Sequence, residues 1–108
     1  MESCVFCKIA RGEIPSAKVY EDEHALAFLD IKPISEHHAL VIPKRHCANI
    51  LDIPAGELAH VMAAVKNIVD MYHDTGMTGV QIIHNAGAAA GQEVFHFHMH
   101  IIPRTLLK

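Results

Sequence analysis

The sequence lacks the features of several specialised protein classes. It has no tryptophan and no low-complexity segment, and no apolar run approaches the roughly 20 residues of a membrane-spanning helix. The first residues have neither the basic start nor the apolar stretch of a signal peptide. Nine Lys and Arg residues are scattered and outnumbered by 12 Asp and Glu, giving a formal net charge of −3. We therefore expect a soluble, cytoplasmic protein with no membrane and no nucleic-acid partner.

Cysteine is also scarce, with only three residues. An odd count in a reducing compartment argues against a disulfide framework, so the thiols should be free or bound to metal. Apolar residues make up 51% of the 108 residues and charged residues 19%. This composition can bury one hydrophobic core, and the length leaves no room for a second. We expect a single domain over residues 1–108.

Histidine, in contrast, is abundant. Ten histidines outnumber the nine Lys and Arg residues. Imidazole is the side chain best suited to proton transfer, nucleophilic attack and metal binding near neutral pH. The histidines are therefore where we expect the chemistry of this protein.

The spacing of apolar residues predicts an α+β fold. Between Pro54 and Asp74 they recur at steps of three and four, which indicates one long amphipathic helix with Asp52 as N-cap and Gly76 just beyond its end. Short β-type runs are expected at 18–21, 25–30, 39–42, 79–84 and 96–102. Five strands in this order around one helix are typical of an antiparallel sheet.

The last of these runs carries three histidines in alternation. On a strand, His96, His98 and His100 would share one face, and the apolar residues between them would face the core. The backbones of the outer two would stand about 13 Å apart, too far for one zinc ion to be held by all three. Neighbours two residues apart can still cooperate at one reacting centre.

Three further patterns can take part in chemistry. His38 and His46 flank an apolar strand and are candidate metal ligands or supporting groups. Cys4 and Cys7 have C-x2-C spacing, which is half of a tetrahedral metal site; a redox dithiol and two unrelated thiols are the alternatives. The small-residue loop 86–91 is a simple connection or, with its two glycines, a place where backbone amides approach an anion.

Together these motifs resemble the histidine triad family of nucleotide hydrolases and transferases, in its Hint-like, bacterial-type branch. The resemblance spans nearly the whole chain. It rests on an ordered set of segments: Cys-Val-Phe-Cys-Lys-Ile at 4–9, Gly-Glu-Ile-Pro at 12–15, His-Ala-Leu-Val-Ile-Pro-Lys at 38–44, Gly-Gln at 91–92 and His-x-His-x-His at 96–100.

The resemblance implies an architecture and an activity. The architecture is a five-stranded antiparallel sheet with one long and one short N-terminal helix, and two copies that join into a ten-stranded sheet. Family members bind purine nucleoside monophosphates and cleave a bond at the α-phosphorus. The substrate class implied here is a purine nucleoside 5′-phosphoramidate or related adenylyl conjugate.

The resemblance also implies roles for individual residues. His98 matches the nucleophile that forms a covalent nucleotidyl intermediate, and His100 the phosphate contact. His38 matches the proton relay, and with His96 these form the candidate catalytic set. The candidate nucleotide-binding residues are Asp30 for the ribose, Asn85, the turn residues Gly91, Gln92, Glu93 and Val94, and an apolar base pocket of Val5, Phe6, Ile9, Ile14, Phe28 and Ile31.

Some members of this branch carry a structural zinc ion, and its ligands correspond to Cys4, Cys7, His46 and His96. No cofactor is then required for catalysis. Glu93 stands where many members have Ser or Thr, and an ionised carboxylate cannot donate a proton to a leaving group. Three alternatives therefore stay open: a dinucleoside polyphosphate hydrolase or nucleotidyltransferase, a low-turnover nucleotide-binding and zinc-holding scaffold, and a purely structural zinc protein.

Overall fold

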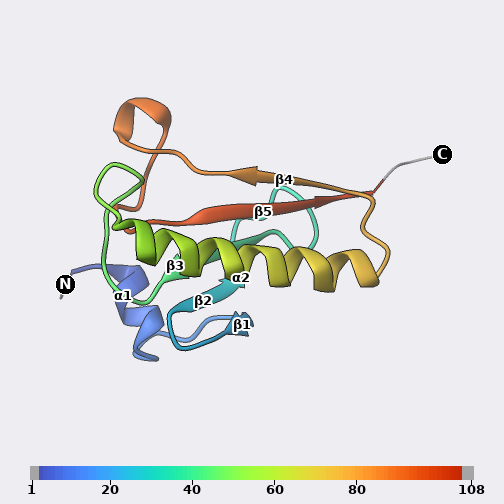
Figure 1. The fold of residues 1–108 in the computed structure, drawn as a ribbon, viewed down its shortest axis with the longest axis horizontal. Coiled ribbons are helices and arrows are strands. Elements are labelled where there is room, and N and C mark those ends of the chain that lie inside the picture. The colour runs from blue at the N-terminus through green and yellow to red at the C-terminus, as the bar shows by residue number, and fades with distance from the viewer. Residues whose placement is uncertain (1–2, 106–108) are drawn as a thin grey trace.

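The computed structural model describes residues 3–105 and has an α+β fold, as the apolar spacing predicted. One antiparallel sheet has the strand order β1-β2-β3-β5-β4, and the long helix runs across one of its faces (Figure 1). The elements are α1 (Val5–Ala10), β1 (Lys18–Glu21), β2 (Ala25–Leu29), β3 (Ala39–Pro43), α2 (Ala55–Asp74), β4 (Gly79–Ile83), the short 3₁₀ helix η1 (Ala88–Ala90) and β5 (Met99–Arg104). None of the helices within residues 3–105 is long and apolar enough to span a bilayer.

The two faces of the sheet pack against different partners. Alternate residues of β2 and β3 enter one of two clusters, because successive side chains of a strand point to opposite faces. The α2 side holds Ala25, Ala27, Ala39, Val41 and Ile101 with Val61, Ala64, Val65 and Ile68 of the helix. The opposite side holds Leu26, Phe28, Leu40 and Ile42 with Phe6 of α1. This second side is where the candidate functional groups gather.

The start of α2 differs from the prediction. The N-cap position is Pro54, which makes no side-chain capping bond. The prediction that Asp52 caps the helix is wrong: its carboxylate accepts hydrogen bonds from the amides of Ala48 and Asn49, at 3.0 and 2.9 Å, and closes the preceding turn instead. At the other end, Gly76 follows the helix with φ of +106°, a conformation that favours glycine.

The last strand begins later than predicted, at Met99 and not at residue 96. β3 pairs with β5 only through Ala39, Leu40 and Val41. Past Val41, the carbonyl of Pro43 accepts a hydrogen bond from the ring Nε2 of His96 at 2.8 Å. This acceptor is therefore used by a side chain and not by the backbone of a paired strand. Residues 96–98 are therefore irregular backbone. The last strand also ends two residues later than predicted, at Arg104, and the other predicted boundaries agree with the structure to within one residue.

Candidate functional site

A cavity of about 660 Å³ opens on the sheet face opposite α2, between α1, the end of β2 and the segment before β5. Its wall combines apolar side chains with a few polar groups, which is the usual character of a small-molecule site. Of the residues expected at a nucleotide site, it contains Val5, Phe6, Ile9, Phe28, Asp30, Ile31, Asn85, Gly91, Glu93, Val94, His98 and His100.

Two residues expected at this site lie elsewhere. Ile14 lines a neighbouring groove of about 300 Å³. Gln92 is buried, and its side-chain oxygen accepts from Asn49 Nδ2 at 3.1 Å and from the Gly87 amide at 2.8 Å. Its Nε2 donates to the carbonyls of Ala48 and Val94. Gln92 thus fastens the loop 86–94 to the turn before α2, and its side chain has no group left for a ligand.

His98 presents one ring nitrogen to the cavity. Its Nδ1 donates to the carbonyl of His96 at 2.8 Å, which leaves the lone pair on Nε2. The ring is buried, and the edge of Phe6 contacts it with ring centroids 5.3 Å apart. Burial lowers the pKa of His98 below its ordinary value, so the imidazole is neutral at pH 7 and can act as a nucleophile.

His38 and His100 form a hydrogen-bonded pair with defined proton positions. The amide of Ile34 donates to His38 Nδ1 at 3.1 Å, so the proton of neutral His38 is on Nε2. That nitrogen lies 3.0 Å from His100 Nδ1 and donates to it. His100 therefore carries its own proton on Nε2, available as a donor.

The Asp30 carboxylate completes this cluster, 3.7 Å from His38 Nε2. The ligand atoms of Asp30, His38 and His100 are close enough to hold a metal ion. A metal on His38 Nε2 would need that nitrogen deprotonated, while the Ile34 amide already uses the lone pair on Nδ1. The hydrogen bonding of the cluster therefore favours proton transfer over metal binding.

The neutral state of these rings predicts a pH dependence of stability. Burial, and then the neighbouring His98 and His38, lowers the pKa of His100 from 6.5 to about 4; burial also lowers the pKa of His38. Between pH 6.5 and 4 the unfolded chain binds more protons than the folded chain. The free energy of unfolding should fall by about 1.4 kcal/mol per pH unit for each such proton as the solution is acidified.

Urea unfolding at pH 7, 6 and 5 measures this slope. His100→Asn is the matched variant, because it removes one of the shifted groups and should lower the slope by about one proton. Identical slopes for the variant and the wild type would contradict this assignment.

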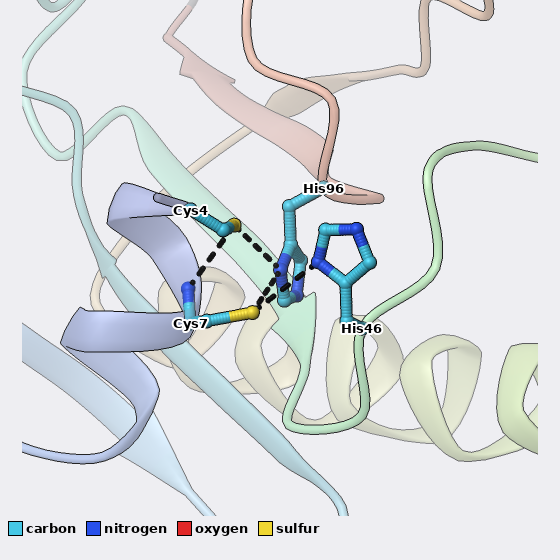
Figure 2. A group of neighbouring side chains, drawn as sticks. All are labelled: Cys4, Cys7, His46 and His96. Carbon is cyan, nitrogen blue, oxygen red and sulfur yellow. Dashed lines mark hydrogen bonds between the residues drawn. The ribbon is translucent and has the colours of Figure 1, made fainter. Parts of the chain in front are cut away.

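A second cluster lies at the N-terminal end of α1. The four side chains predicted as metal ligands, Cys4, Cys7, His46 and His96, converge from α1, the loop after β3 and the segment before β5 (Figure 2). Their ligand atoms all lie within 4.8 Å of one another. The Cys7 thiol is 3.2 Å from His46 Nδ1 and 3.4 Å from His96 Nδ1, and Cys4 Sγ is 3.4 Å from the same His96 nitrogen.

This geometry fits a tetrahedral ion. With metal–sulfur and metal–nitrogen bonds of the usual zinc lengths, ligand atoms are separated by roughly 3.5 Å. The carbonyl of Pro43 engages Nε2 of His96, which aims Nδ1 at the thiols as an outer hydrogen bond does in many metal sites. Burial, and then its hydrogen bond with Cys4, raises the pKa of the Cys7 thiol, a shift that a bound cation would reverse. The cluster can hold a metal ion.

The structure separates the three histidines of the motif into two places. His96 faces the thiols, whereas His98 and His100 face the cavity, with their ring centroids 5.2 Å apart. Phe97, which lies between His96 and His98, and Ile101, which follows His100, are fully buried on the α2 side. This division matches the expectation that His96 and His100 stand too far apart to serve one centre.

His84 was not singled out by the sequence patterns. It contacts the segment that carries His98, since its Nδ1 donates to the His98 carbonyl at 3.0 Å. The only sequence signal was its position at the predicted end of the fourth strand, beside Asn85. Nothing in that local pattern indicates which backbone group the ring contacts.

Comparison with known proteins gives a consistent picture. The HIT domain family matches residues 11–106. An uncharacterized HIT-like protein of Methanocaldococcus jannaschii is 50% identical over 101 residues, covering 94% of this chain and 78% of that protein. An adenosine 5′-monophosphoramidase of Saccharomyces cerevisiae is 45% identical (94% of this chain, 63% of that protein), and an adenylylsulfatase of Arabidopsis thaliana is 45% identical (94% and 52%).

Solved structures agree with the fold. The crystal structure of a member of the HIT family from Bacillus subtilis superposes with a TM-score of 0.89 at 50% identity, covering 94% of this chain and 73% of that chain.

Proposed function

The chain belongs to the HIT domain family, and from this premise we propose that it is a hydrolase of purine nucleoside 5′-phosphoramidates or related adenylyl conjugates. One observation carries the proposal. The His98 Nδ1 proton is held by the His96 carbonyl, and the opposite nitrogen is left free at a cavity that also contains His100. Relatives named as an adenosine 5′-monophosphoramidase and an adenylylsulfatase support a hydrolase that acts on nucleotides.

In the proposed reaction, the lone pair of His98 Nε2 attacks the α-phosphorus. An N–P bond forms, the bond from phosphorus to the amine breaks, and the amine nitrogen takes a proton from solvent as it departs, a proton that the attacking water of the second step returns. The His98 imidazole becomes cationic in the covalent intermediate, and the His96 carbonyl on Nδ1–H stabilises that charge. Water then attacks phosphorus, which releases the nucleoside monophosphate and restores neutral His98.

His100 and His38 support this chemistry. The Nε2–H of His100 is placed to donate to a phosphoryl oxygen, where negative charge develops during attack. The chain of hydrogen bonds from the Ile34 amide through His38 sets this proton position, because it leaves only one tautomer for His100. No metal ion takes part in these steps.

The rest of the cavity suits a nucleoside. We assign the Asp30 carboxylate to the ribose hydroxyls, since two acceptor oxygens suit two vicinal hydroxyls. One of its oxygens already accepts from the Lys32 amide at 3.0 Å, which orients the group. The apolar wall, including Phe6, Ile9 and Phe28, is assigned to the base.

Glu93 favours a phosphoramidate over a dinucleoside polyphosphate. The charged side chains at the cavity are the carboxylates of Asp30 and Glu93 and one ammonium, Lys32. A polyphosphate leaving group would bring several negative charges to this wall, whereas an amine brings none. The alternative activity within the family is therefore disfavoured by charge.

Replacing Glu93 by glutamine should weaken the expected preference for a phosphoramidate over a dinucleoside polyphosphate. One unit charge near the surface contributes about 1 kcal/mol, so the ratio of kcat/KM for adenosine phosphoramidate over diadenosine polyphosphate should fall about fivefold. Steady-state kinetics on both substrates measures the ratio, and Glu93→Asp, which keeps the charge, is the control. A wild-type preference for diadenosine polyphosphate would overturn the proposed substrate class.

A low-turnover nucleotide-binding module is the second candidate, because the ionised Glu93 cannot donate a proton to the leaving group. Equal single-turnover rates for the wild type and for His98→Ala would favour this module over the enzyme.

Two further assignments belong to the proposed function. We assign a structural zinc ion to Cys4, Cys7, His46 and His96, where it would bind α1 to the segment that carries His98. We also propose a homodimer that extends the sheet, because β4 is an edge strand and Ile82 on it is 39% exposed. Sedimentation equilibrium distinguishes a dimer from a monomer.

A further inference from the structure

His84 connects three parts of the molecule through one imidazole ring. Its Nδ1 is 3.0 Å from the carbonyl of His98, and its Nε2 is 3.0 Å from the amide nitrogen of Ile50. The ring also stacks on Phe97, with centroids 4.4 Å apart and planes 24° apart. Neither the proposed chemical steps nor the proposed metal site uses this histidine.

The proton of His84 has a defined position. An amide can donate only to a ring nitrogen with a lone pair, so the Ile50 contact requires an unprotonated Nε2. The proton is then on Nδ1, which donates to the His98 carbonyl. Both nitrogens of the neutral ring are thus fully used by backbone groups.

The backbone at His98 lies next to Phe97, whose amide donates to the Cys47 carbonyl at 2.6 Å. β5 begins at Met99, and the pairing of β3 with β5 reaches no further than Val41 opposite Met99. The His98 carbonyl therefore lies outside the sheet ladder and is held by a side chain. His84 itself directly follows the last residue of β4, Ile83, which pairs with His100. The hydrogen bond from His84 to the His98 carbonyl therefore ties His98, the residue just before β5, to the end of β4.

From these contacts we infer that His84 is a positioning residue for His98. The inference rests on the proposed function, in which His98 Nε2 attacks phosphorus. Two hydrogen bonds orient the His98 ring. The His96 carbonyl accepts from its Nδ1, and the bond from His84 Nδ1 to the His98 carbonyl holds the main chain to which the ring is attached. Stacking on the fully buried Phe97 keeps the His84 ring in the plane that both hydrogen bonds require.

The same ring also restrains the turn before α2. Ile50 follows Asn49, which binds the side chain of Gln92 in the loop 86–94. The His84 ring is therefore linked both to the His98 carbonyl and, through the turn at Asn49 and Ile50, to the cavity wall at Gly91 and Glu93. Loss of His84 should disturb the direction of attack more than the binding of the nucleoside, which involves α1 and β2.

Two conservative variants separate the two hydrogen bonds. Asparagine places an amide nitrogen near the position of Nδ1 and retains the bond to His98, whereas glutamine reaches the position of Nε2 and retains the bond from Ile50. We expect His84→Gln and His84→Leu to lower kcat for adenosine phosphoramidate by roughly 10- to 100-fold, with KM changed by less than about threefold. His84→Asn should lose less than about threefold in kcat.

Thermal unfolding supplies the structural control. His84→Asn and His84→Gln each lose one hydrogen bond and should show similar melting temperatures, so a difference in kcat between them reports positioning. Similar kcat values for the two variants, or kcat values that follow the melting temperatures, would overturn the inference.

A measurement without substrate separates this inference from the proposed function. Long-range ¹H–¹⁵N correlation spectra of the His98 ring should show the single Nδ1–H tautomer in the wild type and in His84→Asn, and a mixture in His84→Gln. Unaltered His98 signals in His84→Gln would contradict the positioning role. Absence of turnover and of a covalent adduct in the wild type would instead refute the proposed function.

Discussion

Replacing His98 by alanine is expected to lower kcat for adenosine phosphoramidate on the order of 10⁴-fold, the largest effect of any single substitution in this chain. The variant has no lone pair at the position that faces the cavity, so the covalent intermediate cannot form. The affinity for AMP should change far less, because the apolar wall and Asp30 remain. Single-turnover kinetics and AMP titration measure the two effects.

Intact mass spectrometry shows the intermediate directly. Wild-type protein mixed with an amine adenylate and quenched rapidly should gain the mass of one AMP moiety, and His98→Ala should gain none. His73→Ala, which removes an exposed histidine at the end of α2, is the matched control and should retain the adduct. An adduct that persists in His98→Ala would place the nucleophile elsewhere.

Removing the metal is expected to have the largest effect on stability. The protein should bind about one equivalent of zinc, and Cys4→Ser should bind much less. Loss of the ion leaves two thiols and two imidazoles packed together, with α1 no longer attached to His46 and His96. A cost of about 2–3 kcal/mol corresponds to a decrease in melting temperature of roughly 10–20 °C for a domain of this size.

Elemental analysis and thermal unfolding with and without a chelator test this expectation. The chelator should lower the melting temperature of the wild type and leave that of Cys4→Ser nearly unchanged. Cys47→Ser is the control for thiol loss: Cys47 is outside the cluster, so this variant should keep its zinc. A wild-type zinc content below about half an equivalent would refute the metal assignment.

The two effects are connected through one residue. The ring of His96 faces the thiols, and its backbone carbonyl accepts the Nδ1 proton of His98. A metal ion at this cluster would therefore restrain the same residue that fixes the His98 tautomer. We expect part of the activity to be lost with zinc even though no step of the reaction involves the ion.

Much of the fold followed from local patterns. The three- and four-residue spacing located α2 to within one residue, and the alternation at 96–101 put His98 and His100 on the face opposite Phe97 and Ile101. These patterns are reliable because helix and strand geometry repeat over a few residues. The predicted start of β5 was wrong because the His96 side chain donates to the carbonyl of Pro43, 53 positions away, and so occupies a backbone acceptor.

The residue types and their order determined by themselves that the alternating histidines and the paired cysteines could carry chemistry, and the family resemblance added Asp30. Only the tertiary structure decided which nitrogen of each ring carries its proton, that the Gln92 side chain joins two loops and that the His84 ring contacts the His98 carbonyl. Several of those properties depend on hydrogen bonds between residues 14 to 62 positions apart, such as His84 with His98 and His38 with His100. The proton positions of His98 and His38 also depend on bonds to residues two and four positions away, whose geometry the tertiary structure sets. A local pattern specifies which face a side chain occupies, but its hydrogen-bonding partner is set by the packing of distant segments.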